Sequence, residues 1–271
     1  MKTLTKIMAL AFAALILIPT AAQAQKKNQK VGIVAHRGFW NCEEAGYAKN
    51  SIASLRCAQL SGVWGSEFDV NMTADSVLVV FHDSTIDGKR IEKHNFTEFK
   101  DYRLKNGEPI PTLDEYLEQA KLSPRMMLVF ELKSHSCPEV EEKAVRLSIR
   151  KLEEYGLLDP SKVTFISFST YICERFSQSL PDFDVQYLNG DLKPSKVKKA
   201  GISGIDYHYN EMYTNKKWIA NARKKGMSTN VWTVNKEEDM RNILNMKPQM
   251  LTTDNPLEAR EIMKEMGIQE L

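Results

Sequence analysis

The sequence predicts an α/β fold in which strand–helix units close into a (β/α)8 TIM-type barrel. Strand-like apolar runs alternate with helical stretches along nearly the whole chain, an order typical of βαβ units and a parallel sheet. Residues 25–271 also match the roughly 250 residues that are typical of one such barrel. Because this length holds about eight units, we expect a closed barrel rather than an open doubly wound sheet, and a single domain over residues 25–271.

The residues before this domain, 1–24, have the pattern of a secretory signal peptide. Lys2 and Lys6 precede an apolar run from Ile7 to Ile18, and the small-residue site Ala22-Gln23-Ala24 follows. The run is shorter than the roughly 20 apolar residues that a membrane span needs. We therefore expect cleavage after Ala24, a secreted and periplasmic protein, and no membrane span in the mature chain.

Nine strand-like runs and eight helical stretches follow in order. The strands are expected at Val31–Ala35, Trp64–Val70, Val77–Phe81, Met126–Leu132, Val163–Phe168, Val185–Leu188, Ile205–His208, Ser228–Val234 and Met250–Thr253. The helices are expected at Ser51–Leu60, Leu113–Lys121, Glu139–Tyr155, Tyr171–Ser179, Pro194–Ala200, Lys216–Lys225, Lys236–Asn242 and Pro256–Met266. The polar stretch from Asp83 to Pro111 fits neither pattern, and we expect it on the surface.

Local signals support several of the helix boundaries. In the first helix apolar residues recur every three or four positions, and Gly62 stands just beyond its end. Thr112 precedes the second helix with Glu115 three positions later, which predicts a capping box. Asp254 or Asn255 is expected to cap the last helix.

Charge and cysteine content exclude some classes of protein. Without Lys2 and Lys6 the chain has equal numbers of basic and acidic residues, whereas nucleic-acid-binding proteins usually carry a basic excess. We therefore expect a small-molecule partner and no nucleic acid. The four cysteines are widely and irregularly spaced, so neither a zinc site nor a redox motif is predicted, and their pairing stays open.

Three carboxylates stand at strand spacing in buried-type strands. Residues two apart on a strand point the same way, so Glu67 and Asp69 share a face. Glu131 stands on another strand, two positions before Lys133. Since chemistry in barrels collects at the carboxyl ends of the strands, we expect the three acids to converge there. An all-oxygen ligand set favours Ca²⁺ or Mg²⁺.

Two histidines directly follow apolar strands. His36 comes after Val31–Ala35 and His82 after Val77–Phe81. One neutral and one protonated imidazole beside a metal can act as base and acid near neutral pH. Arg37 offers a bidentate phosphate contact and Lys133 a second cation. Together with the carboxylates, this set predicts hydrolysis of a phosphate diester.

The chain resembles the glycerophosphodiester phosphodiesterase family. The motifs that carry the resemblance are Ala35-His36-Arg37-Gly38, Asn50-Ser51, Glu67-Phe68-Asp69-Val70, Phe81-His82-Asp83, Ile110-Pro111-Thr112-Leu113, Glu131-Leu132-Lys133, Val231-Trp232-Thr233-Val234-Asn235 and Thr253-Asp254-Asn255-Pro256. The resemblance implies a barrel with a small insertion after the second strand, here Asp83–Pro111. It also implies metal binding by Glu67, Asp69 and Glu131, acid–base catalysis by His36 and His82, and substrate contacts from Arg37, Lys133 and Trp232.

Two segments depart from the pattern of that family. The family usually has Pro-Glu-Asn-Thr after the first loop, and this chain has Ala48-Lys49-Asn50-Ser51. Lys49 thus replaces an acid, and we expect it to change the charge near the pocket. The segment Phe39–Tyr47 is also atypical, and we expect it to alter access for the alcohol group of the substrate.

The expected reaction is metal-dependent hydrolysis of glycerophosphodiesters to glycerol 3-phosphate and an alcohol. Two alternatives remain: a lysophospholipase D-like or phosphoinositide-cleaving phosphodiesterase on the same barrel, and a non-catalytic phosphodiester-binding protein. The residues leave open the head group, the native metal and whether a cyclic phosphate forms. They also leave open which histidine is the acid and what the oligomeric state is.

Overall fold

The computed structural model describes residues 29–271. The expected signal peptide, residues 1–24, lies outside the described residues. In the part of the chain that the structure describes, no helix combines the length and the apolar character needed to cross a membrane.

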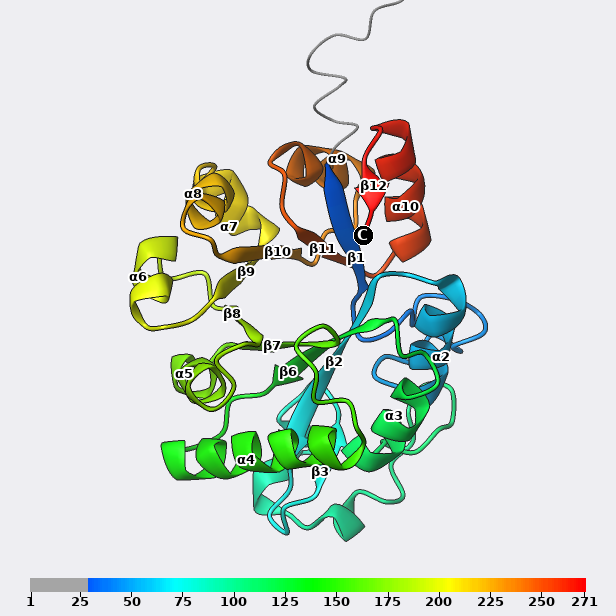
Figure 1. Ribbon diagram of the computed structural model, residues 1–271. Coiled ribbons are helices and arrows are strands. Elements are labelled where there is room, and N and C mark those ends of the chain that lie inside the picture. Colours follow the sequence, from blue (N-terminus) through cyan, green and yellow to red (C-terminus); the bar gives the residue numbers. More distant parts are fainter. Residues whose placement is uncertain (1–28) are drawn as a thin grey trace, which may run out of the picture.

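Eight parallel strands form the barrel, and the helices lie outside them (Figure 1). The strands are β1 (Lys30–Ala35), β2 (Gly65–Met72), β6 (Met127–Leu132), β7 (Val163–Ser167), β8 (Asp184–Tyr187), β9 (Gly204–His208), β10 (Ser228–Trp232) and β11 (Met250–Thr253). Hydrogen bonds between neighbouring segments bring β10 next to β11, with Gln249 N donating to Thr229 O at 3.1 Å. The predicted (β/α)8 barrel is therefore confirmed.

The eight predicted helices begin and end close to where the sequence places them, and α7 is an additional helix that the sequence analysis did not predict. They are α2 (Ile52–Ser61), α3 (Leu113–Ala120), α4 (Pro138–Glu154), α5 (Thr170–Ser179), α6 (Pro194–Lys199), α7 (Tyr209–Thr214), α8 (Trp218–Lys224), α9 (Glu237–Asn245) and α10 (Pro256–Glu265). Ser51 and Thr112 form capping boxes at the starts of α2 and α3. Of the two residues expected to cap α10, Asn255 is the N-cap residue, although its side chain makes no capping hydrogen bond, and the Asp254 carboxylate contacts His36 instead.

The strand predicted at Val77–Phe81 exists, but it is not a barrel strand. It forms β3 (Leu78–Val80), which pairs antiparallel with the end of β2. The chain thus leaves the barrel after β2 and returns along it, and Phe81 N donates to Asp69 O at 2.9 Å. This return brings His82 to the same barrel end as the carboxylates.

The insertion after the second strand has its own small structure. It contains the hairpin β4 (Thr85–Ile86) and β5 (Lys89–Arg90) and the short 3-10 helices η1 (Ile91–Lys93) and η2 (Phe96–Glu98). A separate apolar cluster holds it together, including Ile91 and Phe99. The insertion therefore has a core of its own beside the mouth of the barrel.

Alternation along the strands divides apolar from polar side chains. Phe68 on β2 packs outward against Tyr116 and Phe130, with ring centroids 4.5 Å and 5.1 Å away. The next residues on either side, Glu67 and Asp69, face the other way, into the barrel. A packed outer layer thus fixes the strand that carries two of the acids.

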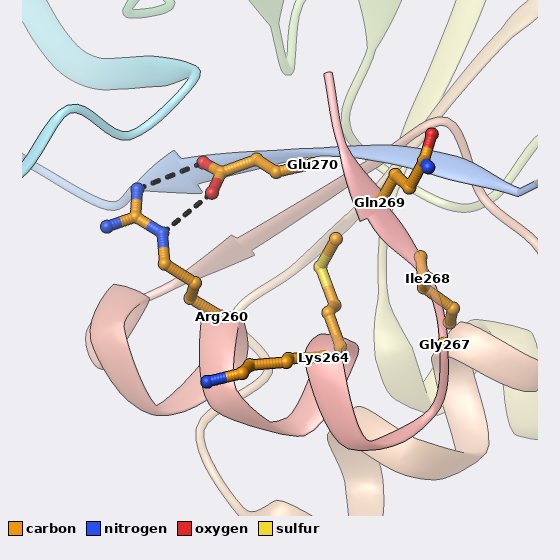
Figure 2. Close-up of a pocket in the computed structure, with 7 residues that line it drawn as sticks. Arg260, Lys264, Gly267, Ile268, Gln269 and Glu270 are labelled. Carbon is orange, nitrogen blue, oxygen red and sulfur yellow. Dashed lines mark hydrogen bonds and ion pairs between the residues drawn. The ribbon is translucent and has the colours of Figure 1, made fainter. Parts of the chain in front are cut away.

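A wide hollow on the described part of the molecule shares no lining residue with the cavity that these acids face. It has a volume of about 630 Å³ and lies between α10 and the final strand β12 (Gln269–Glu270), which pairs with the start of β1 (Figure 2). Arg260 neutralises Glu270 there, with Nε 2.7 Å from Oε2, and its guanidinium also donates to Ser61 O. These contacts fasten β12 to α10 and to the end of α2, and Lys264 in the same lining pairs with Glu261 at 3.6 Å.

All four cysteines are thiols in the structure. Cys42 in the Phe39–Tyr47 segment donates to Phe39 O at 3.2 Å. Burial, together with the neighbouring Cys42 thiol, raises the pKa of Cys57 to about 12. The Cys57 thiol is therefore protonated at neutral pH.

Candidate functional site

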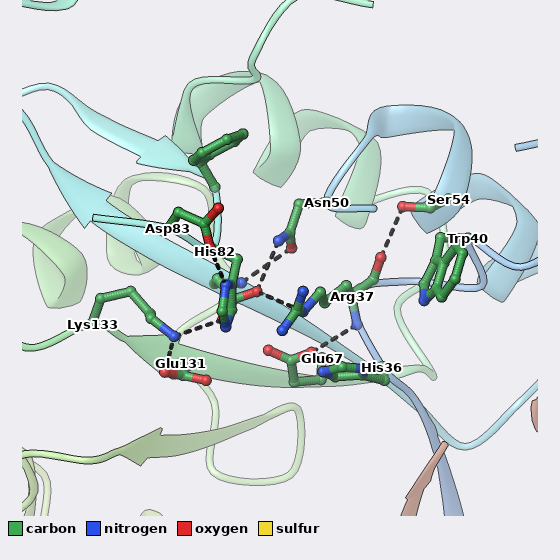
Figure 3. Close-up of polar contacts among 12 residues, drawn as sticks. His36, Arg37, Trp40, Asn50, Ser54, Glu67, His82, Asp83, Glu131 and Lys133 are labelled. Carbon is green, nitrogen blue, oxygen red and sulfur yellow. Dashed lines mark hydrogen bonds and ion pairs between the residues drawn. The ribbon is translucent and has the colours of Figure 1, made fainter. Parts of the chain in front are cut away.

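Three buried carboxylates from two adjacent strands meet at the carboxyl end of the barrel. Glu67 and Asp69 stand on β2, and Glu131 stands beside Asp69 on β6 in the parallel register. One oxygen of each lies within 4.8 Å of the others, and each residue is at most 7% exposed. The structure therefore brings together the three residues predicted as metal ligands (Figure 3).

The carboxylate cluster of Glu67, Asp69 and Glu131 would be stabilised by a bound positive charge. Burial and the nearby charges of Asp69 and Glu131 raise the pKa of Glu67 well above its usual range. Burial likewise raises the pKa of Glu131 to about 7, against the opposing effect of Lys133. Among the described residues, the buried Glu67 Oε1 has no hydrogen-bond partner. A divalent cation would satisfy this oxygen and the excess negative charge, and a set of carboxylate oxygens suits a hard ion.

Two fixed cations flank the cluster. Lys133 Nζ lies 2.6 Å from Glu131 Oε1 and 3.2 Å from Asp69 Oδ1, and Arg37 Nε lies 3.5 Å from Asp69 Oδ2. Burial alone would raise the pKa of Asp69, but Lys133, His82, Arg37 and the hydrogen bond from Asn50 together lower it. Asp69 is therefore ionised, whereas Glu67 and Glu131 readily hold protons.

His36 follows β1 and is held from behind by a second acid. Its Nδ1 lies 2.7 Å from Asp254 Oδ1, and the same carboxylate accepts hydrogen bonds from Trp40 Nε1 and Asn235 Nδ2. These contacts lower the pKa of Asp254 to about 2, although burial works in the opposite direction. With Nδ1 engaged, Nε2 is the ring nitrogen left to face the cavity.

His82 stands at the opposite flank, on the segment that returns along β2. Its Nδ1 lies 2.6 Å from Asp83 Oδ1. Burial lowers the pKa of His82, the Asp69 charge raises it, and Lys133 and Arg37 lower it further. The structure thus places the two predicted histidines at one cavity, each with a carboxylate on its Nδ1.

A left-handed turn aims the first histidine and Arg37. Arg37 has φ +56° and Gly38 has φ +75°. This geometry lets Arg37 N donate to Glu67 Oε2 at 2.7 Å and Gly38 N donate to Glu67 O at 3.0 Å. A Cβ at Gly38 would lie 2.4 Å from Ser54 Oγ, so only glycine fits at this close approach to α2.

The groups surround a cavity of about 120 Å³. Its lining includes His36, Arg37, Glu67, His82 and Glu131, together with Asp206 and Trp232. The Trp232 indole packs edge-on against Phe168 and donates to Asp206 O at 2.9 Å. Trp232 therefore lies at the cavity as predicted, where its ring forms part of the wall.

Two acids at this site were not among the predicted site residues. Asp254 had been assigned to helix capping, and Asp206 had not been singled out. Burial and the Glu131 charge raise the pKa of Asp206 well above its usual range. Asp206 lies within β9 and Asp254 directly follows β11, so a search for acids on and just after barrel strands, the rule that selected Glu67 and Glu131, would also have selected them.

Comparison with known proteins agrees with this geometry. The model of the glycerophosphoryl diester phosphodiesterase family matches residues 36–258. The crystal structure of a glycerophosphodiester phosphodiesterase from Parabacteroides distasonis is 41% identical and superposes with a TM-score of 0.84, covering 88% of this chain and 98% of that one. A glycerophosphodiester phosphodiesterase of Caldanaerobacter subterraneus is 27% identical over 84% of this chain and 95% of its own.

A second similar structure carries a ligand. It is an Oleispira antarctica phosphodiesterase in complex with the product sn-glycerol-3-phosphate, with 22% identity and a TM-score of 0.73 over 86% of this chain and 96% of that one. At this identity the similarity shows a common fold. The family match and the 41% identical structure go further: the chain is a member of the glycerophosphoryl diester phosphodiesterase family of enzymes.

Proposed function

We propose that this enzyme hydrolyses glycerophosphodiesters to glycerol 3-phosphate and an alcohol in a reaction that depends on a divalent metal ion. The observation that carries the proposal is the meeting of three buried carboxylates, two imidazoles and an arginine around one cavity. The product complex of the Oleispira antarctica relative supports the choice of substrate class.

Glu67, Asp69 and Glu131 would hold the metal. When bound, Ca²⁺ or Mg²⁺ supplies Lewis acidity toward a phosphoryl oxygen and lowers the pKa of an attacking hydroxyl. Asn50 keeps one ligand oriented, since its side-chain nitrogen donates to Asp69 Oδ2 at 2.8 Å while its oxygen accepts from Asp69 N at 3.2 Å. Such outer contacts fix a carboxylate in place before the ion arrives.

His36 acts as the general base. Asp254 accepts a hydrogen bond from Nδ1–H and so selects the tautomer whose Nε2 carries the lone pair. Nε2 takes the proton from the attacking water or from the glycerol hydroxyl of the substrate. A new P–O bond then forms as the bond to the leaving alcohol breaks.

His82 acts as the general acid. It lines both the metal-side cavity and a wider neighbouring groove, so it stands where a leaving alcohol would depart. Burial lowers the pKa of His82, which makes its imidazolium a stronger acid toward the leaving oxygen. Arg37 and Lys133 are the cations near the phosphoryl oxygens, and charge developing there is stabilised by such groups.

Release of glycerol 3-phosphate tests the proposal. The enzyme is freed of metal with a chelator, dialysed and assayed on several glycerophosphodiesters before and after addition of Ca²⁺ or Mg²⁺. Activity should vanish with chelation and return with the metal. Glu67→Ala and His36→Ala should each abolish turnover while the melting temperature stays that of a folded protein, and exposed Glu43→Gln is the matched control.

The same assay separates the alternative substrate. Lysophosphatidylcholine is included beside glycerophosphocholine, and clear preference for the acylated compound would replace the proposed substrate with a lysophospholipid. Tight binding of all diesters without any turnover, with every metal supplied, would contradict an enzymatic role.

We also propose, from the sequence alone, that the protein is exported to the periplasm after removal of residues 1–24. The support is the charged start, the short apolar run and the small-residue site at Ala24. Cell fractionation with intact-mass measurement should give a periplasmic protein that begins at Gln25. A full-length protein in the cytoplasm would contradict this location.

A further inference from the structure

A second, wider groove continues from the catalytic cavity. It has a volume of about 430 Å³ and shares Arg37 and His82 with the cavity on the metal side. Its other walls come from two segments, the Phe39–Tyr47 loop and the insertion, which supply Trp40, Tyr47, Tyr102 and Lys105. Figure 3 shows Arg37 and His82 close to the carboxylates, with Trp40 beyond Arg37.

The position of the shared residues assigns the two spaces to the two halves of a diester. Under the proposed function the phosphate lies at Arg37 and His82, so its two substituents extend into the two spaces. The metal-side cavity is the smaller, at about 120 Å³, and it suits glycerol, the part that all these substrates have in common. The groove then receives the alcohol, whose leaving oxygen would be protonated by His82.

Two lysines give this groove its charge. Lys49 Nζ lies 4.4 Å from the centre of the Trp40 ring, and Lys105 Nζ lies 5.0 Å from the centre of the Tyr47 ring. Both side chains are exposed, and in the described part of the chain each ammonium contacts a ring rather than a carboxylate. Their positive charge is therefore available to a ligand.

Two acids close to the groove, Asp83 in its lining and Glu108 in the insertion, are already engaged. Asp83 pairs with His82 at 2.6 Å. Glu108, three positions after Lys105, accepts a hydrogen bond from Ile52 N at 2.9 Å at the start of α2. The groove thus presents, in addition to Arg37, two ammonium groups that have no ion-pair partner among the described residues.

The same contacts disfavour a cationic head group. Quaternary ammonium ligands bind on the faces of aromatic rings, and in this groove the protein's own lysines cover faces of Trp40 and Tyr47. A choline group would have to displace an ammonium group from either of these two rings and would meet like charge. A phosphate or carboxylate on the alcohol would instead be attracted by them.

We propose that this groove is the subsite for the leaving alcohol and that Lys49 and Lys105 select diesters whose alcohol carries an additional anionic group. The proposal rests on the proposed phosphodiesterase function and adds its substrate class. Lys49 and Lys105 are specificity-determining residues, and the hydrolysis itself needs neither of them.

Three substrates that differ in the charge of the alcohol test the proposal. They are glycerophosphoinositol 4-phosphate, glycerophosphoinositol and glycerophosphocholine, assayed for glycerol 3-phosphate release with the metal-loaded enzyme. kcat/KM should be at least tenfold higher for the phosphorylated inositol than for choline, a ratio worth about 1.4 kcal/mol. Because exposed charges are screened by salt, the ratio should shrink between 0.05 and 0.5 M salt.

Substitutions of the lysines test whether Lys49 and Lys105 cause the substrate preference. The double variant Lys49→Met, Lys105→Met should remove the preference by lowering turnover of the phosphorylated substrate and raising that of the choline substrate. Lys100→Met removes another exposed lysine of the insertion and should leave the ratio unchanged. Circular dichroism and the melting temperature check that each variant is folded.

The outcomes separate the two proposals. No turnover of any diester would contradict the proposed function itself. Turnover with equal kcat/KM for all three substrates, or with choline preferred, would contradict only the anionic subsite. If the double variant slowed all three substrates by the same factor, the lysines would act on the part common to them, and the assignment of the groove to the alcohol would be wrong.

Discussion

The imidazole Nδ1 of His36 lies 2.7 Å from the carboxylate of Asp254, a residue 218 positions further along the chain. The two residues directly follow the neighbouring parallel strands β1 and β11, in which Ala35 lies opposite Thr253. Each side chain directly follows its strand, so barrel closure itself sets their distance. Trp40 and Asn235 hold Asp254 in place, with donor distances of 2.8 Å and 2.6 Å.

Replacing this acid should slow chemistry more than binding. Asp254→Asn keeps the size of the side chain but permits its amide to donate to His36 Nδ1, which favours the wrong tautomer. We expect kcat to fall by about 10²-fold or more with little change in KM. Steady-state kinetics measure both constants. Trp40→Phe, which removes one donor and keeps the acid, should cost far less, and equal losses in the two variants would contradict the tautomer argument.

Metal binding should release protons near neutral pH. Burial raises the pKa of Glu131 to about 7, so part of this group is protonated at pH 7 and must ionise to bind a cation. Affinity for Ca²⁺ or Mg²⁺ should therefore rise from pH 6 to pH 8. Calorimetry in buffers of different ionisation enthalpy counts the protons. Glu131→Gln should reduce both affinity and proton release, whereas an affinity that stays flat over this range would contradict the prediction.

The same group links stability of the metal-free enzyme to pH. A carboxyl whose pKa is raised by folding contributes stability that is present below about pH 4.5 and is lost as pH rises through about 7. The melting temperature of the metal-free protein should therefore fall between pH 5 and pH 8 more steeply than that of Glu131→Gln. Added metal should remove most of the difference, and parallel curves for the two proteins would refute this linkage.

Substitution by alanine should destabilise the protein far more at Gly38 than at Gly107, a glycine with a similar positive φ. Gly38→Ala places a Cβ 2.4 Å from Ser54 Oγ at φ +75°, while Gly107 has φ +84° and no atom within 4 Å of such a Cβ. We expect Gly107→Ala to cost about 1 kcal/mol from backbone strain alone and Gly38→Ala about 2–4 kcal/mol. Urea unfolding measures both, and equal costs would mean that the contact with α2 relaxes easily.

Trp232 should contribute to substrate binding through its ring. It lines the cavity, and its Nε1 donates to Asp206 O at 2.9 Å. Trp232→Phe keeps an aromatic wall but loses area and this hydrogen bond, so KM should rise roughly tenfold with a smaller change in kcat. Trp218→Phe, on α8 and packed against Tyr207 with ring centroids 5.7 Å apart, is the matched control. Unchanged KM in Trp232→Phe would place the ring outside the substrate-binding surface.

Much of the fold was predictable because it follows from local physics. Apolar periodicity located the helices, and the capping boxes at Ser51 and Thr112 lie where Ser and Thr precede helical runs. The strict alternation of side chains on a strand put Glu67 and Asp69 on one face. These features depend on residues that lie within a few positions of one another in the sequence, so a short segment is enough to predict them.

Other relationships arise only when the barrel closes. The antiparallel course of β3, the partner of His36 at Asp254, and the placing of Lys49 over Trp40 all depend on how separate segments meet in space. A segment's own residues do not reveal which acid will approach a given imidazole, because that distance depends on strand register and on the paths of intervening loops. The residue types of the candidate site thus follow from local sequence, while their partners and the neighbouring groove depend on tertiary packing.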